Sequence, residues 1–143
     1  MLRIILNRLK PKAEKIIPEE QAGFRAGRIT TEQIFNLCIL CEKYLQHQQD
    51  FYHVFIDFRK AFNRVWHAAM WATMKKYNFS TNLIQVIKNL YNKATSAVLF
   101  NSNWFRTTVG VRQGYLISTT HFNIFLERIM TEALEDHEGT VSI

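Results

Sequence analysis

Two short segments of the chain combine residue types that can handle metal ions and phosphates. In the first, Asp57 ends an apolar run and is followed directly by Phe58, Arg59 and Lys60. A carboxylate at the carboxyl end of a buried strand is a hard oxygen ligand that suits Mg²⁺, and the two cations could neutralise a phosphate. In the alternative interpretation, Asp57 caps the next turn and both cations face solvent.

The second segment is the turn Gly110–Gly114, in which two glycines bracket Arg112 and Gln113. Glycine allows the backbone to approach a ligand closely, and the Gln113 amide offers both a donor and an acceptor. Such a turn can position a template base or a nucleotide sugar. It can equally be a connection from a hairpin to a helix, without any ligand.

Three further side chains could contribute to the same kind of site. Phe62 follows Asp57 closely and could form one wall of a nucleotide pocket, although a lone aromatic more often belongs to a core. Arg25 and Arg28 lie in a glycine-containing loop before a helix and could each grip a phosphate through paired hydrogen bonds. Isolated arginines are, however, usually ordinary surface residues.

Composition fits a folded basic domain. The chain has 143 residues, 48% of them hydrophobic, and its net charge of +6 comes from 18 Lys and Arg against 12 Asp and Glu. The apolar fraction is ample for a core. The positive charge favours polyanionic partners such as nucleic acid, and an ordinary basic protein is the alternative. Because no apolar run reaches 18 residues and no signal peptide is recognisable, we expect an intracellular location, in the cytoplasm or nucleus.

The remaining patterns predict the elements that would position these residues. A short helix over 2–10 should stop near Pro11. Thr30 and Gln33 form a capping box for a helix that runs to about His47, and Cys38 and Cys41 fall on its apolar stripe, which predicts buried, inert thiols. Residues 52–57 read as a buried strand.

In the second half, helical periodicity and turn residues predict three helices and a hairpin. We expect helices over 68–77, after a cap at Ser80 or Thr81, and after a cap at Ser118 or Thr119 with an end at Gly139. Between the second and third of these, 95–100 and 104–109 should pair as a hairpin around Asn101-Ser102-Asn103.

Four segments, in order, resemble the reverse transcriptases of non-LTR (LINE-type) retrotransposons, which are related to group II intron enzymes. They are Ile5–Leu9, like the first segment of that domain; Gln21–Ile34, like its fingers motif; Phe55–Val65, like palm motif A; and Gly110–Gly114 continuing through Ser118 to Asn123, like motif B. The resemblance implies an α/β (α+β) fragment of polymerase fingers and palm, with helices on a small mixed or antiparallel sheet. It divides the chain into partial fingers (1–50) and partial palm (51–143).

The resemblance also implies a role for each site residue. Asp57 would be the motif A metal ligand and Phe58 would add its carbonyl. Phe62 would sense the sugar 2′-position, and Gln113 and Gly114 would line the nascent base pair. Arg25 and Arg28 would face the triphosphate or the template, and Arg112 would be a further substrate-binding residue. The implied reaction is RNA-directed DNA polymerisation with two Mg²⁺ ions, an RNA template, a DNA primer and dNTP.

The sequence departs from the family pattern in four ways. Asn63, Tyr115 and Thr119 replace the usual aspartate, cysteine and proline, which puts the motif B loop geometry in doubt. The fourth departure is the lack of motif C, an aromatic-Ala-Asp-Asp hairpin. Two divalent ions about 4 Å apart repel by about 17 kcal/mol at an effective dielectric constant of about 20, so several carboxylates must offset the repulsion.

Aspartate occurs only at positions 50, 57 and 136. We therefore expect a truncated chain that does not polymerise by itself. Without the motif C strands, its apolar motif A strand should lose partners on one side. A non-catalytic nucleic-acid-binding remnant and a pseudogene product without a role are the alternatives.

Overall fold

The computed structural model describes residues 1–92, 95–97, 104–112 and 114–135, with the backbone alone at 95–97 and 104–106. These residues form two compact units, which are described separately. One unit contains Met1–Pro18 and the described part of Lys60–Ser142, and the other contains Glu19–Arg59.

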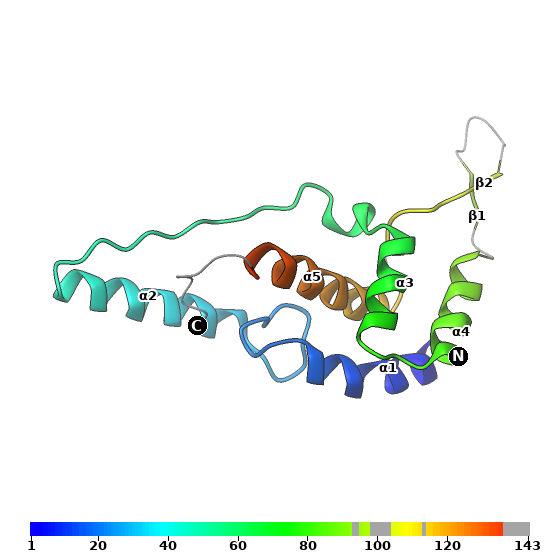
Figure 1. The fold of residues 1–143 in the computed structure, drawn as a ribbon, viewed down its shortest axis with the longest axis horizontal. Coiled ribbons are helices and arrows are strands. Elements are labelled where there is room, and N and C mark those ends of the chain that lie inside the picture. Colours follow the sequence, from blue (N-terminus) through cyan, green and yellow to red (C-terminus); the bar gives the residue numbers. More distant parts are fainter. Residues whose placement is uncertain (93–94, 98–103, 113, 136–143) are drawn as a thin grey trace. The chain divides into compact units, whose positions relative to one another are not determined.

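The larger unit is a group of helices with a short ribbon of two strands. Helix α5 packs against α1 and α3, and α3 also packs against α4 (Figure 1). Its elements in chain order are α1 (Leu2–Ile16), the 3-10 helix η1 (Ala61–Arg64), α3 (His67–Lys76), α4 (Thr81–Asn92), β1 (Thr95–Ala97), β2 (Trp104–Arg106) and α5 (Ser118–Leu134).

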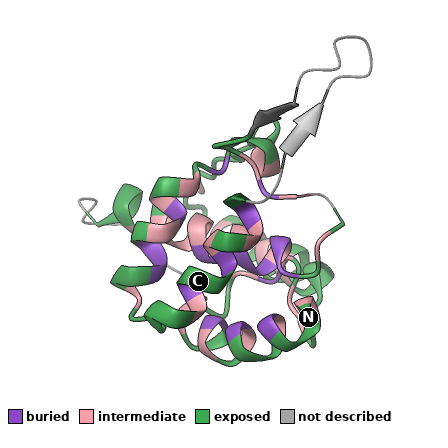
Figure 2. Cartoon of the chain, turned by 90° about the vertical axis from the view of Figure 1, so that its right-hand side faces the viewer, coloured by how far each residue is buried: buried purple, intermediate pink, exposed green. Residues whose placement is uncertain are grey.

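Helical spacing of apolar residues builds the core of this unit. In α4, Ile84, Ile87 and Tyr91 recur on one face and are buried. They meet Leu9 of α1, Met70 of α3 and other buried residues in one hydrophobic cluster, and buried positions line the inner faces of the helices in Figure 2. Each such side chain contributes about 1.5–3 kcal/mol relative to an exposed one.

Helix α1 continues through Pro11 to Ile16, so the prediction that it stops near Pro11 is wrong. A proline inside a helix costs about 3 kcal/mol because it removes one hydrogen bond and crowds the preceding turn. Leu9 and Ala13, on either side of Pro11, are fully buried. Their burial in the core offsets the cost, and no local rule could anticipate that packing.

The smaller unit contains α2 (Thr30–Gln46), close to the predicted range. The capping box is not formed: Ile29 occupies the N-cap position without a side-chain hydrogen bond, and Thr30 is already helical. No residue of α2 is buried in the described structure, and Cys38 is exposed while Cys41 is half-buried. The prediction of buried thiols is therefore wrong for Cys38.

The predicted strand over 52–57 is also wrong. These residues run without helix or strand pairing, and Tyr52, Val54, Phe55 and Ile56 are all largely exposed. A strand requires a hydrogen-bonded neighbour, and none of the described segments pairs with this one. The described part of the chain is thus mainly helical, and its helices do not pack on the predicted sheet.

The predicted hairpin is confirmed in a shortened form. β1 and β2 pair antiparallel, with Thr95 opposite Arg106 and Ala97 opposite Trp104, while 101–103 lie outside the described residues. The predicted helix over 68–77 is confirmed as α3, the helix after Ser80 as α4, and the last helix as α5; its predicted end at Gly139 also lies outside the described residues. No described helix has the length and apolar character that a membrane span requires.

Candidate functional site

The turn that begins at Gly110 is hydrogen-bonded to the last residues of the predicted motif A segment. The Val111 amide donates to the Phe62 carbonyl at 2.8 Å, and the Gly110 amide donates to the Val65 carbonyl at 2.8 Å. Trp66 and Val109 form an isolated antiparallel bridge. The structure thus brings together two segments that the sequence singled out separately.

Gly110 is required at its position by both conformation and space. Its φ is 88°, and a Cβ added there would lie 3.2 Å from the Asn63 carbonyl oxygen and 3.3 Å from the Asn63 Cα. Backbone atoms cannot move aside as a flexible side chain can, so a larger residue would push the turn away from η1. The turn and η1 are therefore packed backbone against backbone.

The far end of the turn is held by side chains. Ser118, the first residue of α5, donates through Oγ to the Arg112 carbonyl at 2.6 Å rather than capping its own helix, which corrects the predicted cap. The Arg112 guanidinium donates to the Tyr115 hydroxyl at 2.6 Å and lies 5.1 Å from the centre of that ring. Gly114 is exposed with φ 80°, and Gln113 lies outside the described residues.

The Phe62 ring is half-buried and stacks on Phe122 of α5, with ring centroids 4.5 Å apart and an interplanar angle of 28°. Stacked aromatic pairs contribute about 0.5–1.5 kcal/mol beyond burial. This contact places the ring at the edge of the hydrophobic core, while the Phe62 carbonyl binds the Gly110 turn.

Asp57 and Phe58 belong to the smaller unit, where both are exposed at the end of the extended segment. Among the described residues, no group of three or more His, Cys, Asp or Glu side chains could hold a metal ion together. The described chain therefore supplies Asp57 as a single carboxylate at this position.

Arg25 and Arg28 contact residues of their own loop. Arg28 Nη2 lies 2.9 Å from Glu19 Oε1, and the Glu19 side chain is 83% exposed. Arg25 Nη1 donates to the Gln21 carbonyl at 3.1 Å. Exposed ion pairs contribute only about 0–1 kcal/mol, so a phosphate could displace Glu19 from Arg28 at little cost.

A buried polar group that the sequence did not reveal lies between α3, α4 and α5. Burial, and then the charge of His67, lower the pKa of His121 from 6.5 to about 4. Burial raises the pKa of Tyr91 to about 12, and its hydroxyl lies 3.4 Å from His121 Nδ1. Both side chains are uncharged at neutral pH. The only signal in the sequence for this buried polar pair is that a histidine, His121, lies on the apolar stripe of the last predicted helix.

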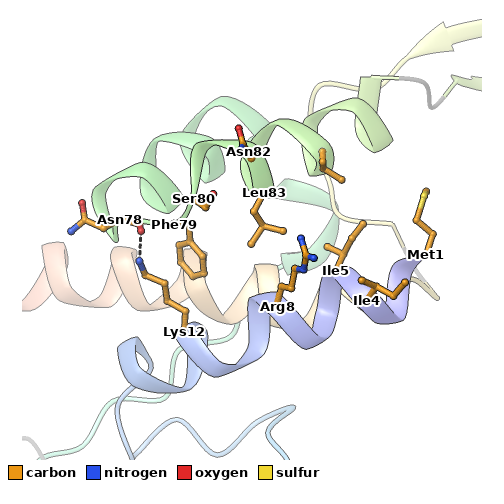
Figure 3. Close-up of a pocket in the computed structure, with 11 residues that line it drawn as sticks. Met1, Ile4, Ile5, Arg8, Lys12, Asn78, Phe79, Ser80, Asn82 and Leu83 are labelled. Carbon is orange, nitrogen blue, oxygen red and sulfur yellow. Dashed lines mark hydrogen bonds between the residues drawn. The ribbon is translucent and has the colours of Figure 1, made fainter.

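A cavity of about 670 Å³ lies between α1 and the start of α4 (Figure 3). Ile5, Phe79 and Leu83 give it an apolar wall, and Arg8 and Lys12 lie at its edge. The Lys12 ammonium donates to the Asn78 carbonyl. None of its described lining residues is a predicted site residue.

Comparison with known proteins identifies the family. The profile described as "Reverse transcriptase (RNA-dependent DNA polymerase)" matches residues 1–143. The chain belongs to the reverse transcriptase family. Together with the mobile-element relatives that follow, this match confirms the resemblance to reverse transcriptases of non-LTR retrotransposons. Among solved structures, none matches this reverse transcriptase chain.

Its curated relatives are much longer proteins. The chain is 29% identical over 136 residues to the RNA-directed DNA polymerase from mobile element jockey of Drosophila melanogaster, covering 92% of this chain and 15% of that protein. It is 30% identical over 128 residues to the probable RNA-directed DNA polymerase from transposon BS of the same species, covering 86% and 14%. The jockey protein of Drosophila funebris is 31% identical over 130 residues, again covering 86% and 14%.

Proposed function

We propose that this reverse transcriptase chain takes part in RNA-directed DNA synthesis, with an RNA template, a DNA primer and dNTP as its partners inside the cell, in the cytoplasm or nucleus. The observation that carries the proposal is the family match along all 143 residues. Net charge supports it, because a chain with 18 cations and 12 acidic side chains is suited to a polyanion.

In this proposal, the turn Gly110–Gly114 positions the template and the nucleotide. Main-chain hydrogen bonds join this turn to 62–67, and the hydrogen bond from the Ser118 hydroxyl to the Arg112 carbonyl joins it to α5. A rigid support of this kind is what a residue needs in order to align a base pair. Gln113 and Gly114 would line the nascent pair, Phe62 would contact the sugar, and Arg112 would stabilise the turn through Tyr115.

Asp57 and the Phe58 carbonyl would hold Mg²⁺. An exposed carboxylate next to a main-chain carbonyl is an oxygen donor set that fits this ion. When bound, the ions neutralise the triphosphate and promote attack by the primer 3′-hydroxyl. Since the described residues converge on no acidic cluster, further carboxylates would be needed for a pair of ions, and we expect no polymerisation by these 143 residues alone.

Arg25 and Arg28 would bind the triphosphate or the template from the fingers part (1–50), and the palm part would comprise 51–143. In the complete polymerase, the apolar run 52–57 would pair into a small sheet that the helices cover. The exposure of Val54 and Phe55 supports this, because two-sided apolar surface is characteristic of a strand buried in a sheet.

Primer extension on an RNA template tests the proposal. A longer polypeptide that carries this chain together with further carboxylates should extend the primer, and Asp57→Asn should abolish extension. The matched control is Asp50→Asn, which removes a nearby exposed carboxylate and should leave activity unchanged. Equal activity of Asp57→Asn and the parent protein would refute the role of Asp57.

Binding to nucleic acid without catalysis is the second candidate, and the net charge of +6 supports it. In that case, the affinity of the 143-residue chain for an RNA–DNA hybrid should fall steeply as salt rises, because counterions are released from the phosphates. Absence of binding at low salt would eliminate this candidate.

A further inference from the structure

His67 makes a side-chain contact that the family assignment does not explain. It is the first residue of α3, and its Nε2 lies 2.7 Å from the Gly110 carbonyl oxygen. A carbonyl oxygen can only accept a hydrogen bond, so Nε2 must carry the proton. The donor comes from a helix of the core, and the acceptor is the first residue of the candidate turn.

The His67 ring is held in one orientation by aromatic neighbours. It meets the Tyr91 ring edge to face, with centroids 4.8 Å apart and an angle of 78°, and the Trp71 ring centroid is 6.2 Å away. Tyr91 in turn contacts Trp71 edge to face at 5.5 Å. The ring is therefore positioned by α3 and α4 rather than by the turn, so it can impose a position on the Gly110 carbonyl.

The same residue is joined to the approach of the turn by its main chain. The His67 amide donates to the Thr108 carbonyl at 3.2 Å, so His67 contacts the turn segment through both backbone and ring. At the other end, Ser118 holds the Arg112 carbonyl. His67 and Ser118 thus fix the two ends of the stretch that precedes Gln113.

We propose that His67 is a positioning residue for 110–112, the part of the turn that precedes Gln113: its Nε2–H holds the Gly110 carbonyl and so sets the geometry of this stretch before any ligand binds. The effect on nucleic-acid binding rests on the proposed function, whereas the effect on the turn itself does not.

A crossed pair of variants separates the hydrogen bond from ring packing. His67→Phe keeps an aromatic ring against Tyr91 but removes the donor, and His67→Gln keeps an N–H donor of similar reach but removes the ring. The reporters are the Gly110 and Val111 amides, whose exchange with deuterium is measured by NMR. We expect about fivefold faster exchange in His67→Phe, since one hydrogen bond is lost, and near-parental exchange in His67→Gln.

The control is His53→Phe, which replaces an exposed histidine of the other unit and should leave the same amides unchanged. Unchanged exchange in His67→Phe, or faster exchange in His67→Gln than in His67→Phe, would overturn the proposal. A second experiment uses the parent protein alone and therefore does not depend on the folding of any variant. Nitrogen NMR of neutral His67 should find the proton on Nε2, and a proton on Nδ1 would contradict the inference.

Binding to a labelled RNA–DNA hybrid separates this inference from the proposed function. If the parent protein binds the hybrid, His67→Phe should bind severalfold more weakly and His67→Gln should bind about as well as the parent. Equal binding by the parent protein and both variants would overturn the link between His67 and ligand binding. If the exchange pattern appears as expected while the parent protein does not bind at low salt, the positioning role stands and the proposed function fails.

Discussion

Acidification should destabilise this protein through His121, which is fully buried and has its pKa lowered from 6.5 to about 4. Since the folded-state pKa is the lower one, the unfolded chain binds more protons between these values. The stabilising effect of neutral His121 is therefore complete above pH 6.5 and is lost as the pH falls through about 4.

The size of this effect follows from the two pKa values. Between about pH 7.5 and about pH 5, the linkage relation gives a loss of about 2 kcal/mol in the free energy of unfolding. Among the described residues, Tyr91 of α4 contacts the His121 ring, and His67 of α3 acts on it electrostatically. Tyr91 stays neutral over this range because burial raises its pKa to about 12.

Urea unfolding at the two pH values, followed by tryptophan fluorescence, measures the effect. His121→Leu lacks the titrating group, so it should lose about 2 kcal/mol less than the parent protein between the two pH values. His53→Leu, at an exposed histidine, should behave like the parent protein. An equal pH dependence in the parent protein and His121→Leu would show that His121 is protonated without cost and would refute the reasoning.

Three other outcomes are expected. Ile87→Ala should lower the free energy of unfolding by about 2–5 kcal/mol because it leaves a cavity at a fully buried position, whereas neighbouring Val86→Ala, at a 45% exposed position, should change it by far less in the same urea titration. Gly110→Ala should lower the melting temperature by more than Gly27→Ala. Both glycines have a positive φ, but of these two only Gly110 has backbone atoms close to the position of the new methyl group. Equal melting temperatures of the two variants would contradict this prediction. Val54→Lys should reduce light scattering on concentration without altering stability, since Val54 is 85% exposed in an unpaired apolar segment; unchanged scattering would argue against that segment as the cause of association.

Local patterns were enough for most of the helices and for the hairpin. The spacing of Ile84, Ile87 and Tyr91 predicts one buried face of α4, and that face is buried. The residues flanking 101–103 predict a reversal, and β1 pairs with β2. These features depend on neighbours within a few positions of each other, so their physical cause is contained in the local sequence.

Long-range contacts account for the errors. Pro11 is a strong local stop signal, yet the packing of Leu9 and Ala13 keeps α1 helical through it. Residues 52–57 have strand composition, but a strand exists only when another segment supplies hydrogen bonds, and composition cannot provide that partner. Cys38 lies on a helical apolar stripe, and its exposure depends on what packs against α2.

The sequence by itself determined the family, the order of the motifs and the residue types available for chemistry, since motifs are local and Asp57, Phe62 and Gly110 are recognisable wherever they fold. Only the tertiary structure joined the Gly110 turn to 62–67 and placed the His67 donor on its carbonyl. A hydrogen bond between residues 43 positions apart has no counterpart in local spacing. It forms because α3, α4 and α5 bury their apolar faces in one core, and this packing brings the His67 ring within reach of the Gly110 carbonyl.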